Sequence, residues 1–223
     1  MVRHGLALHW PCPRESKNNV VTPTRLIRAL AIATGAIAVL VPILLIGAAS
    51  ASTGAYRDAP PPGFSSGFGE PSCHACHFSR EPNEAPGRLA LRGVPERYTP
   101  GTTYPITVIL TRPGMAIAGF QLTARFSDGG QQAGTLAPAK SDSARLTITI
   151  DHNIAYAYQN RAGSTLAARD TATWTLLWTA PSTARAVSFH AAANAANGDD
   201  TVDGDFVYTT TATTAALDPP LRR

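Results

Sequence analysis

The sequence predicts an all-β protein: an antiparallel β-sandwich preceded by an N-terminal hydrophobic helix and a proline- and glycine-rich loop. Three observations lead to this fold class. After residue 87, short runs of valine, isoleucine, threonine and aromatic residues alternate between apolar and polar positions at period two. Turn residues such as Pro100-Gly101 and Pro113-Gly114 separate these runs about every ten to fifteen residues. No stretch after Ala49 keeps a helical apolar period over about three turns.

The alternating runs predict about eight or nine strands. We expect them at 89–91, 104–110, 117–127, 134–136, 146–150, 154–158, 174–179, 187–192 and 206–214. Residues 88–216 then form one sandwich domain, with one face of each sheet buried, and residues 217–223 form a C-terminal tail. A core of this length is stable without a disulfide.

The strand patterns also assign side chains to faces. In the run 117–127, the alternation places Phe120 and its even-numbered neighbours inside, and Gln121, Thr123 and Arg125 outside. In the later runs, Trp174, Trp178 and Phe189 fall on the inner face and His190 on the outer one.

The positive charge is confined to the N-terminus. The chain has a net charge of +4. Residues 1–28 hold five basic side chains and one acidic one, and the rest of the chain holds 14 of each sign. We therefore expect a basic cytoplasmic region at 1–28, and no nucleic-acid surface on the body of the protein, because such a surface needs clustered positive charge.

An apolar segment follows at 29–51. Ala29–Ala49 is 21 residues long without a charged side chain, enough to cross a bilayer as a helix. It is either a signal peptide cut after Ala49-Ser50-Ala51 or an uncleaved transmembrane anchor. Only in the uncleaved case would this segment attach the protein to the membrane. Both alternatives place residues 52–223 outside the cytoplasm, in the periplasm or at the cell surface.

Residues 52–87 read as a proline- and glycine-rich linker that carries the main chemical signal. Cys73, Cys76 and His77 form a C-x-x-C-H sequence, which attaches haem c covalently. The two cysteines would form thioethers with the haem, and His77 would be the proximal ligand of the iron. Two alternatives remain open: a Cys73–Cys76 disulfide, and a zinc half-site that includes His74, although these ligands lie too close together for easy tetrahedral closure.

Other residues are candidates for supporting roles. Met115, His190 and His152 are candidate distal ligands of the iron, and an open sixth position is a further alternative. Three arginines after the motif could pair with haem propionates: Arg80, Arg88 and Arg92. The acidic loop 197–205 lacks the spacing and the closing glutamate of a calcium loop, so a plain hairpin loop is favoured over calcium binding.

The function expected from these residues is electron transfer by a mono-haem c-type cytochrome module. One haem cannot form a long conducting chain, so a redox partner protein in the cell envelope is expected. The sequence has no nucleophile–base motif such as G-x-S-x-G, so we expect no enzymatic activity. The alternative function is a non-redox cell-surface Ig-like interaction module with a Cys73–Cys76 disulfide.

Several segments, in this order, resemble the Reeler (reelin N-terminal) domain and the bacterial choice-of-anchor V proteins. They read PPGFSSGFGEPSCHACH, YTPGTTYPITVIL, GFQLTARF, WTLLWTAP, VSFHAAANAANGD and GDFVYTTT, and they span about residues 60–212. The resemblance implies an extracellular Ig-like sandwich on a variable anchor, without enzymatic activity. One departure is Tyr158-Gln159-Asn160, where relatives often carry a His-Thr pair, so any metal held by that histidine is missing here.

Overall fold

A computed structural model describes residue 56 and residues 58–217, which belong to one compact unit. The expected basic region 1–28, the apolar segment 29–51 and the tail after residue 217 lie outside the described residues. Within the described part of the chain, no helix is long and apolar enough to cross a membrane.

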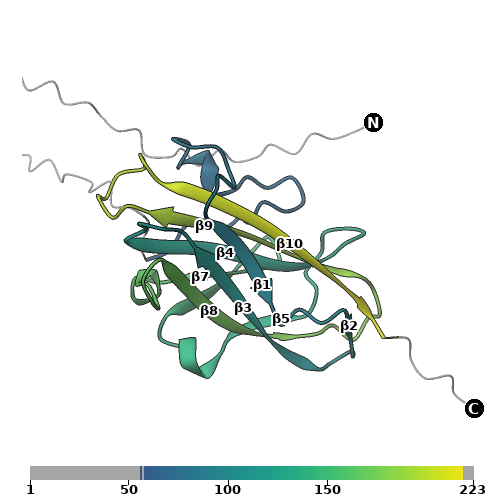
Figure 1. The fold of residues 1–223 in the computed structure, drawn as a ribbon. Coiled ribbons are helices and arrows are strands. Elements are labelled where there is room, and N and C mark those ends of the chain that lie inside the picture. Colours follow the sequence, from purple (N-terminus) through teal and green to yellow (C-terminus); the bar gives the residue numbers. More distant parts are fainter. Residues whose placement is uncertain (1–55, 57, 218–223) are drawn as a thin grey trace, which may run out of the picture. The chain divides into compact units, whose positions relative to one another are not determined.

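The described residues form two packed sheets, so the expected all-β sandwich is confirmed (Figure 1). The four-stranded sheet has the order β1 (Arg88–Arg92), β3 (Thr103–Thr111), β8 (Thr171–Thr179) and β5 (Thr135–Pro138). The six-stranded sheet has the order β2 (Arg97–Tyr98), β10 (Phe206–Ala216), β9 (Val187–Ala196), β4 (Ile117–Phe126), β7 (Ile154–Gln159) and β6 (Leu146–Asp151). Three short 3-10 turns connect them: η1 (Cys73–Ala75), η2 (Lys140–Asp142) and η3 (Ala162–Ser164).

One strand was not expected from the sequence. β2 has only two residues and pairs in parallel with the end of β10, so the sandwich is not antiparallel throughout. Two residues are too few to show an alternation, which explains the miss. Tyr98 anchors β2: its side chain is fully buried, and its hydroxyl lies 2.9 Å from the Thr183 carbonyl oxygen and 2.7 Å from that of Arg185.

Aromatic side chains form the centre of the core between the sheets. Trp174 and Trp178 of β8 are fully buried. Trp174 stacks on Phe120 of β4 with ring centroids 4.5 Å apart, and Trp178 meets Phe189 of β9 edge-on at 4.9 Å. Both indole N–H groups donate to backbone carbonyls, at 2.8 Å and 2.9 Å. The inner face expected for these strands is therefore confirmed, with the polar atoms satisfied as burial requires.

The other face of β4 is also buried, which differs from the expectation of solvent exposure. Gln121 and Thr123 are 1% and 0% exposed, because residues 58–72 pack over them. The Phe64 N–H donates to Gln121 Oε1 at 2.6 Å, and Gln121 Nε2 donates to the Pro61 carbonyl at 2.9 Å. Residues 58–87, which were expected to be a linker, thus form a layer over the six-stranded sheet, called the covering layer below.

Glu70 holds this covering layer to the sheet. Its Oε1 accepts hydrogen bonds from Arg125 at 2.5 Å and from the Tyr156 hydroxyl at 2.6 Å, and its Oε2 accepts one from Ser65 at 2.6 Å. Burial raises the pKa of Tyr156 well above its usual value, and the hydrogen bond to Glu70 raises it further. A phenol that stays protonated remains a donor to this carboxylate across the physiological range.

Candidate functional site

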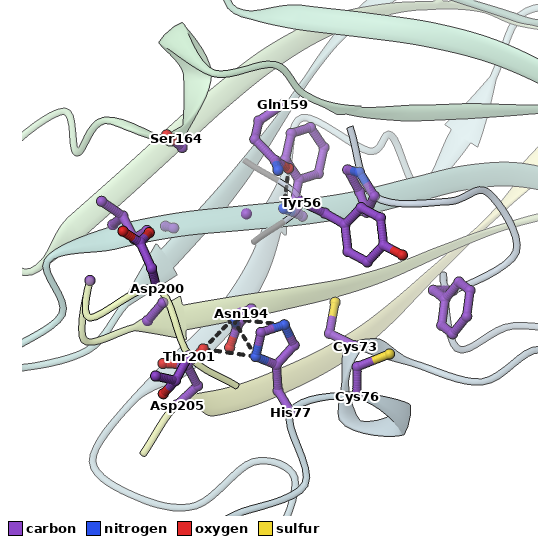
Figure 2. Close-up of a pocket in the computed structure, with 18 of the residues that line it drawn as sticks. Tyr56, Cys73, Cys76, His77, Gln159, Ser164, Asn194, Asp200, Thr201 and Asp205 are labelled. Atoms are coloured by element: carbon purple, nitrogen blue, oxygen red, sulfur yellow. Dashed lines mark hydrogen bonds and ion pairs between the residues drawn. The ribbon is translucent and has the colours of Figure 1, made fainter. Parts of the chain in front are cut away.

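A pocket lies between the covering layer and the end of the six-stranded sheet, and the C-x-x-C-H motif borders it (Figure 2). Its cavity volume is about 110 Å³, below the range of about 300–1,000 Å³ typical of small-molecule and cofactor sites. The first residues of β4 and the last of β9 form its floor, where Gly119 pairs with Asn194 and Ile117 with Ala196. Residues of the covering layer and of the 198–205 loop form its walls.

The local sequence folds the motif into a tight turn. The Ser72 hydroxyl caps η1 by accepting the His74 N–H at 3.2 Å, as serine does at helix starts. The Cys76 and His77 N–H groups then both donate to the Cys73 carbonyl, at 3.2 Å and 3.0 Å. This turn directs Cys73, Cys76 and His77 to the same pocket, so the three residues expected from the sequence are brought together.

His77 makes the best-defined polar contact of the site. Its Nδ1 lies 2.8 Å from Oδ2 of Asp205, a carboxylate that is only 1% exposed. The same oxygen accepts the Asn194 side-chain N–H at 2.9 Å, and the other carboxylate oxygen accepts the Asn197 backbone N–H at 3.1 Å. Figure 2 shows the ring edge remote from Asp205 turned toward Cys73.

Cys73 carries a free thiol, so the Cys73–Cys76 disulfide of the alternative interpretation is not formed in this structure. Burial raises the pKa of the Cys73 thiol to about 12, against the lowering effect of a backbone hydrogen bond. Without a bound metal, this thiol is therefore protonated at neutral pH.

Cys73, Cys76 and His77 are the donor types that haem c requires, two sulfurs and one imidazole, although Cys76 is disulfide-bonded in this structure. The pocket walls are mostly apolar, with Pro60, Pro61, Phe64 and Phe120 among them, as a porphyrin face requires. Asn194 Oδ1 is buried at the floor without a hydrogen-bond partner in the described part of the chain, and such atoms are typical of functional sites. Within these residues, no group of three or more His, Cys, Asp or Glu side chains could hold a metal ion alone.

The candidate distal ligands do not line the pocket. Met115 is 7% exposed and belongs to the core between the sheets. His190 lies under Phe68, with ring centroids 5.1 Å apart, and its Nδ1 is 3.2 Å from the Thr211 hydroxyl. His152 sits in an exposed turn with a positive φ of 46°. Each of these histidines thus has a structural or solvent-exposed position instead.

The candidate arginines also lie away from the pocket lining. Arg88 and Arg92 are exposed on β1, which belongs to the four-stranded sheet. Arg80 is 3.9 Å from Glu84, and its guanidinium lies over the Phe206 ring at 5.4 Å. None of the three is placed to pair with a group inside the pocket.

The 197–205 loop is held by its own hydrogen bonds. The Asp199 carboxylate accepts the backbone N–H and the hydroxyl of Thr201, both at 2.9 Å, and the Thr201 backbone bond is the main reason that the pKa of Asp199 is lowered. Asn197 donates to Asp199 at 2.9 Å. The loop also contacts the covering layer through Ser79, whose hydroxyl donates to Asp203 at 3.0 Å.

Sequence reasoning missed Asp205 and Asn194 as site residues. Asp205 stands in the acidic loop considered for calcium, 128 positions after His77 in the chain. The alternation of β9 places Asn194 on the same face as His190, but no local pattern links either residue to the motif. Their role depends on the covering layer lying over β9, which only the fold provides.

No family model and no curated protein matches the chain. Among solved structures, the chain is similar to the human F-spondin reeler domain, with 21% identity over 62% of this chain and 93% of that one, at a TM-score of 0.41. The Reelin-N domain of F-spondin is 21% identical over 66% of this chain and 96% of that one, also at a TM-score of 0.41. A cohesin module of a family 33 glycoside hydrolase from Clostridium perfringens is 6% identical over 60% of this chain and 98% of that one, at a TM-score of 0.41. These likenesses are too distant to support an argument about function.

The class defined by the fold and the pocket is an all-β sandwich with a C-x-x-C-H pocket on its six-stranded sheet.

Proposed function

We propose that this protein is an extracytoplasmic mono-haem c-type cytochrome module that transfers electrons. Cys73 and Cys76 would tether the haem and His77 would bind its iron. The observation that supports this most is that all three side chains border one pocket with mostly apolar walls. When bound, the haem supplies a one-electron couple between Fe(II) and Fe(III). We do not propose an enzymatic activity of the chain.

The chain's own residues would set the environment of the haem. The apolar walls formed by Phe64, Ile117 and the prolines of the covering layer would shield the haem from water, and burial of this kind is one of the factors that tune a haem potential. The open mouth of the pocket would leave an edge accessible for exchange of electrons with a redox partner protein in the cell envelope.

We further propose that the domain is a Reeler-like relative of the choice-of-anchor V proteins and lies in the periplasm or at the cell surface. The ordered sequence segments between about residues 60 and 212 support this assignment, and the β-sandwich is the fold that it requires. Attachment of haem c outside the cytoplasm agrees with the apolar segment that precedes the domain.

The test is a haem stain of a denaturing gel, together with a reduced-minus-oxidised visible spectrum. The full chain is expressed with haem-attachment machinery that keeps both motif thiols reduced. We expect covalent haem in the wild type and none in the Cys73→Ala/Cys76→Ala variant. The matched control is Cys12→Ala, which removes the remaining cysteine and should keep the haem. A wild type without haem would reject the cytochrome and favour the non-redox surface module.

A further inference from the structure

The contact between His77 and Asp205 has a defined proton position. An amide N–H can only donate and a carboxylate oxygen can only accept. Asp205 Oδ2 therefore receives the Asn194 N–H at 2.9 Å, and at 2.8 Å from His77 it also receives a proton from Nδ1. A neutral imidazole with its proton on Nδ1 has its lone pair on Nε2. Asn194 Nδ2 lies 3.2 Å from Nδ1 and 3.4 Å from Nε2. Because a protonated Nδ1 cannot accept, Asn194 can donate only to Nε2, and 3.4 Å is at the long end of the hydrogen-bond range.

The carboxylate is positioned by the sheet through one oxygen and by the 197–205 loop through the other. Asp205 directly precedes Phe206, the first residue of β10, and its Oδ1 accepts the Asn197 backbone N–H at 3.1 Å. Asn194 lies on the adjacent strand β9, with its partner residue Val207 on β10. A side chain that is 1% exposed and bonded through both oxygens has little freedom to rotate.

We propose that Asp205 is the positioning residue of the iron ligand: it orients His77 through Nδ1, presents Nε2 to the pocket, and lowers the reduction potential of the bound haem. This inference rests on the proposed function. A buried negative charge hydrogen-bonded to a metal-binding histidine increases the basicity of that ligand. It thereby stabilises the more positive Fe(III) state relative to Fe(II).

The experiment measures the midpoint potential of the haem-loaded full chain by spectroelectrochemical titration. Asp205→Asn retains an acceptor oxygen for the Asn197 N–H but removes the charge, so its potential should rise above that of the wild type. Asp205→Glu restores the charge and should return the potential part of the way. The matched control is Asp203→Asn in the same loop, whose carboxylate contacts Ser79 instead of His77 and whose potential should equal that of the wild type.

The outcomes separate this inference from the proposed function. Equal potentials for Asp205→Asn and Asp203→Asn, with haem present in both, would overturn the role of Asp205 and leave the cytochrome intact. Absence of haem from the wild type would overturn the proposed function and the effect on potential together.

The proton position has its own test, which needs neither a variant nor haem. The ¹⁵N chemical shifts of His77 in the haem-free wild type at about pH 8.5, where histidines are ordinarily neutral, should report a protonated Nδ1. A neutral ring protonated at Nε2 would overturn the positioning by Asp205 even if Asp205→Asn fails to fold.

Discussion

His190 shows how a single side chain on the outer face of a strand becomes sensitive to pH. The covering layer buries part of its ring: a Cβ added to Gly67 would lie 2.5 Å from His190 Cγ, so only glycine allows this approach. Burial is the main cause that lowers the pKa of His190 below 6.5, and the positive charge of Arg125 lowers it further, against the opposing effect of Glu70.

This lowered pKa predicts a loss of stability in mild acid. Between the folded pKa and 6.5 the unfolded chain binds more protons, so the contribution of His190 is fully present above about pH 6.5 and is lost as pH falls through the folded value. His190→Gln should therefore lose less stability than the wild type between pH 7.5 and pH 5, as measured by urea unfolding. The control is His152→Gln, whose side chain is 86% exposed and which should behave as the wild type. Equal pH dependence of all three proteins would contradict the prediction.

At the scale of elements, the turns that join the strands differ in how much space they leave. Gly101 and Gly134 both have positive φ, 76° and 74°, a conformation that L-residues adopt at a cost of about 1–2 kcal/mol. A Cβ at Gly101 would meet nothing within 4 Å, whereas one at Gly134, just before β5, would lie 2.1 Å from the Thr179 carbonyl oxygen. Backbone cannot move aside as a flexible side chain can.

Substitution of these two glycines should therefore separate strain from steric clash. We expect Gly101→Ala to lower the free energy of unfolding by about 1 kcal/mol, from conformation alone. Gly134→Ala should cost more than about 2 kcal/mol, because β5 must shift along the edge of the four-stranded sheet. Equilibrium unfolding in guanidinium chloride measures both values, and equal costs would show that the contact at Gly134 relaxes freely.

At the scale of the whole molecule, the segment before β1 is part of the folded unit. Beyond the contacts to β4, the Asn83 N–H donates to the Val207 carbonyl at 2.8 Å, and Asn83 Oδ1 accepts the Thr209 N–H at 2.9 Å, on β10. The Tyr208 hydroxyl donates to the Glu84 carbonyl at 2.9 Å. The segment before β1 thus contributes hydrogen bonds to β4, β7, β9 and β10 of the six-stranded sheet and satisfies polar groups that would otherwise be buried alone.

A chain of residues 88–217 should consequently be much less stable than one of residues 54–217. Loss of the covering layer removes the partners of Gln121, Arg125 and Tyr156, and at about 1 kcal/mol for each hydrogen bond the loss exceeds about 3 kcal/mol. Thermal unfolding and resistance to protease measure it. Glu70→Ala in the longer chain should be intermediate, because it removes one shared acceptor. Equal stability of the two chains would refute the covering role.

Much of the architecture was predictable, because period-two alternation is a local property of each strand. Trp174, Phe120 and Phe189 were assigned correctly to the inner face. The alternation does not reveal what covers the opposite face, so Thr123 was expected in solvent although it is fully buried. β2 escaped prediction because its two residues are too few to show an alternation.

The sequence by itself determined the fold class, the strand positions and the three residues of the C-x-x-C-H motif, since each depends on residue types at short spacing. Only the tertiary structure decided that the motif faces an apolar pocket, that the proline- and glycine-rich segment covers a sheet, and that Asp205 contacts His77. These features depend on contacts between residues far apart in the chain, and local patterns carry no information about which distant side chain will be the partner.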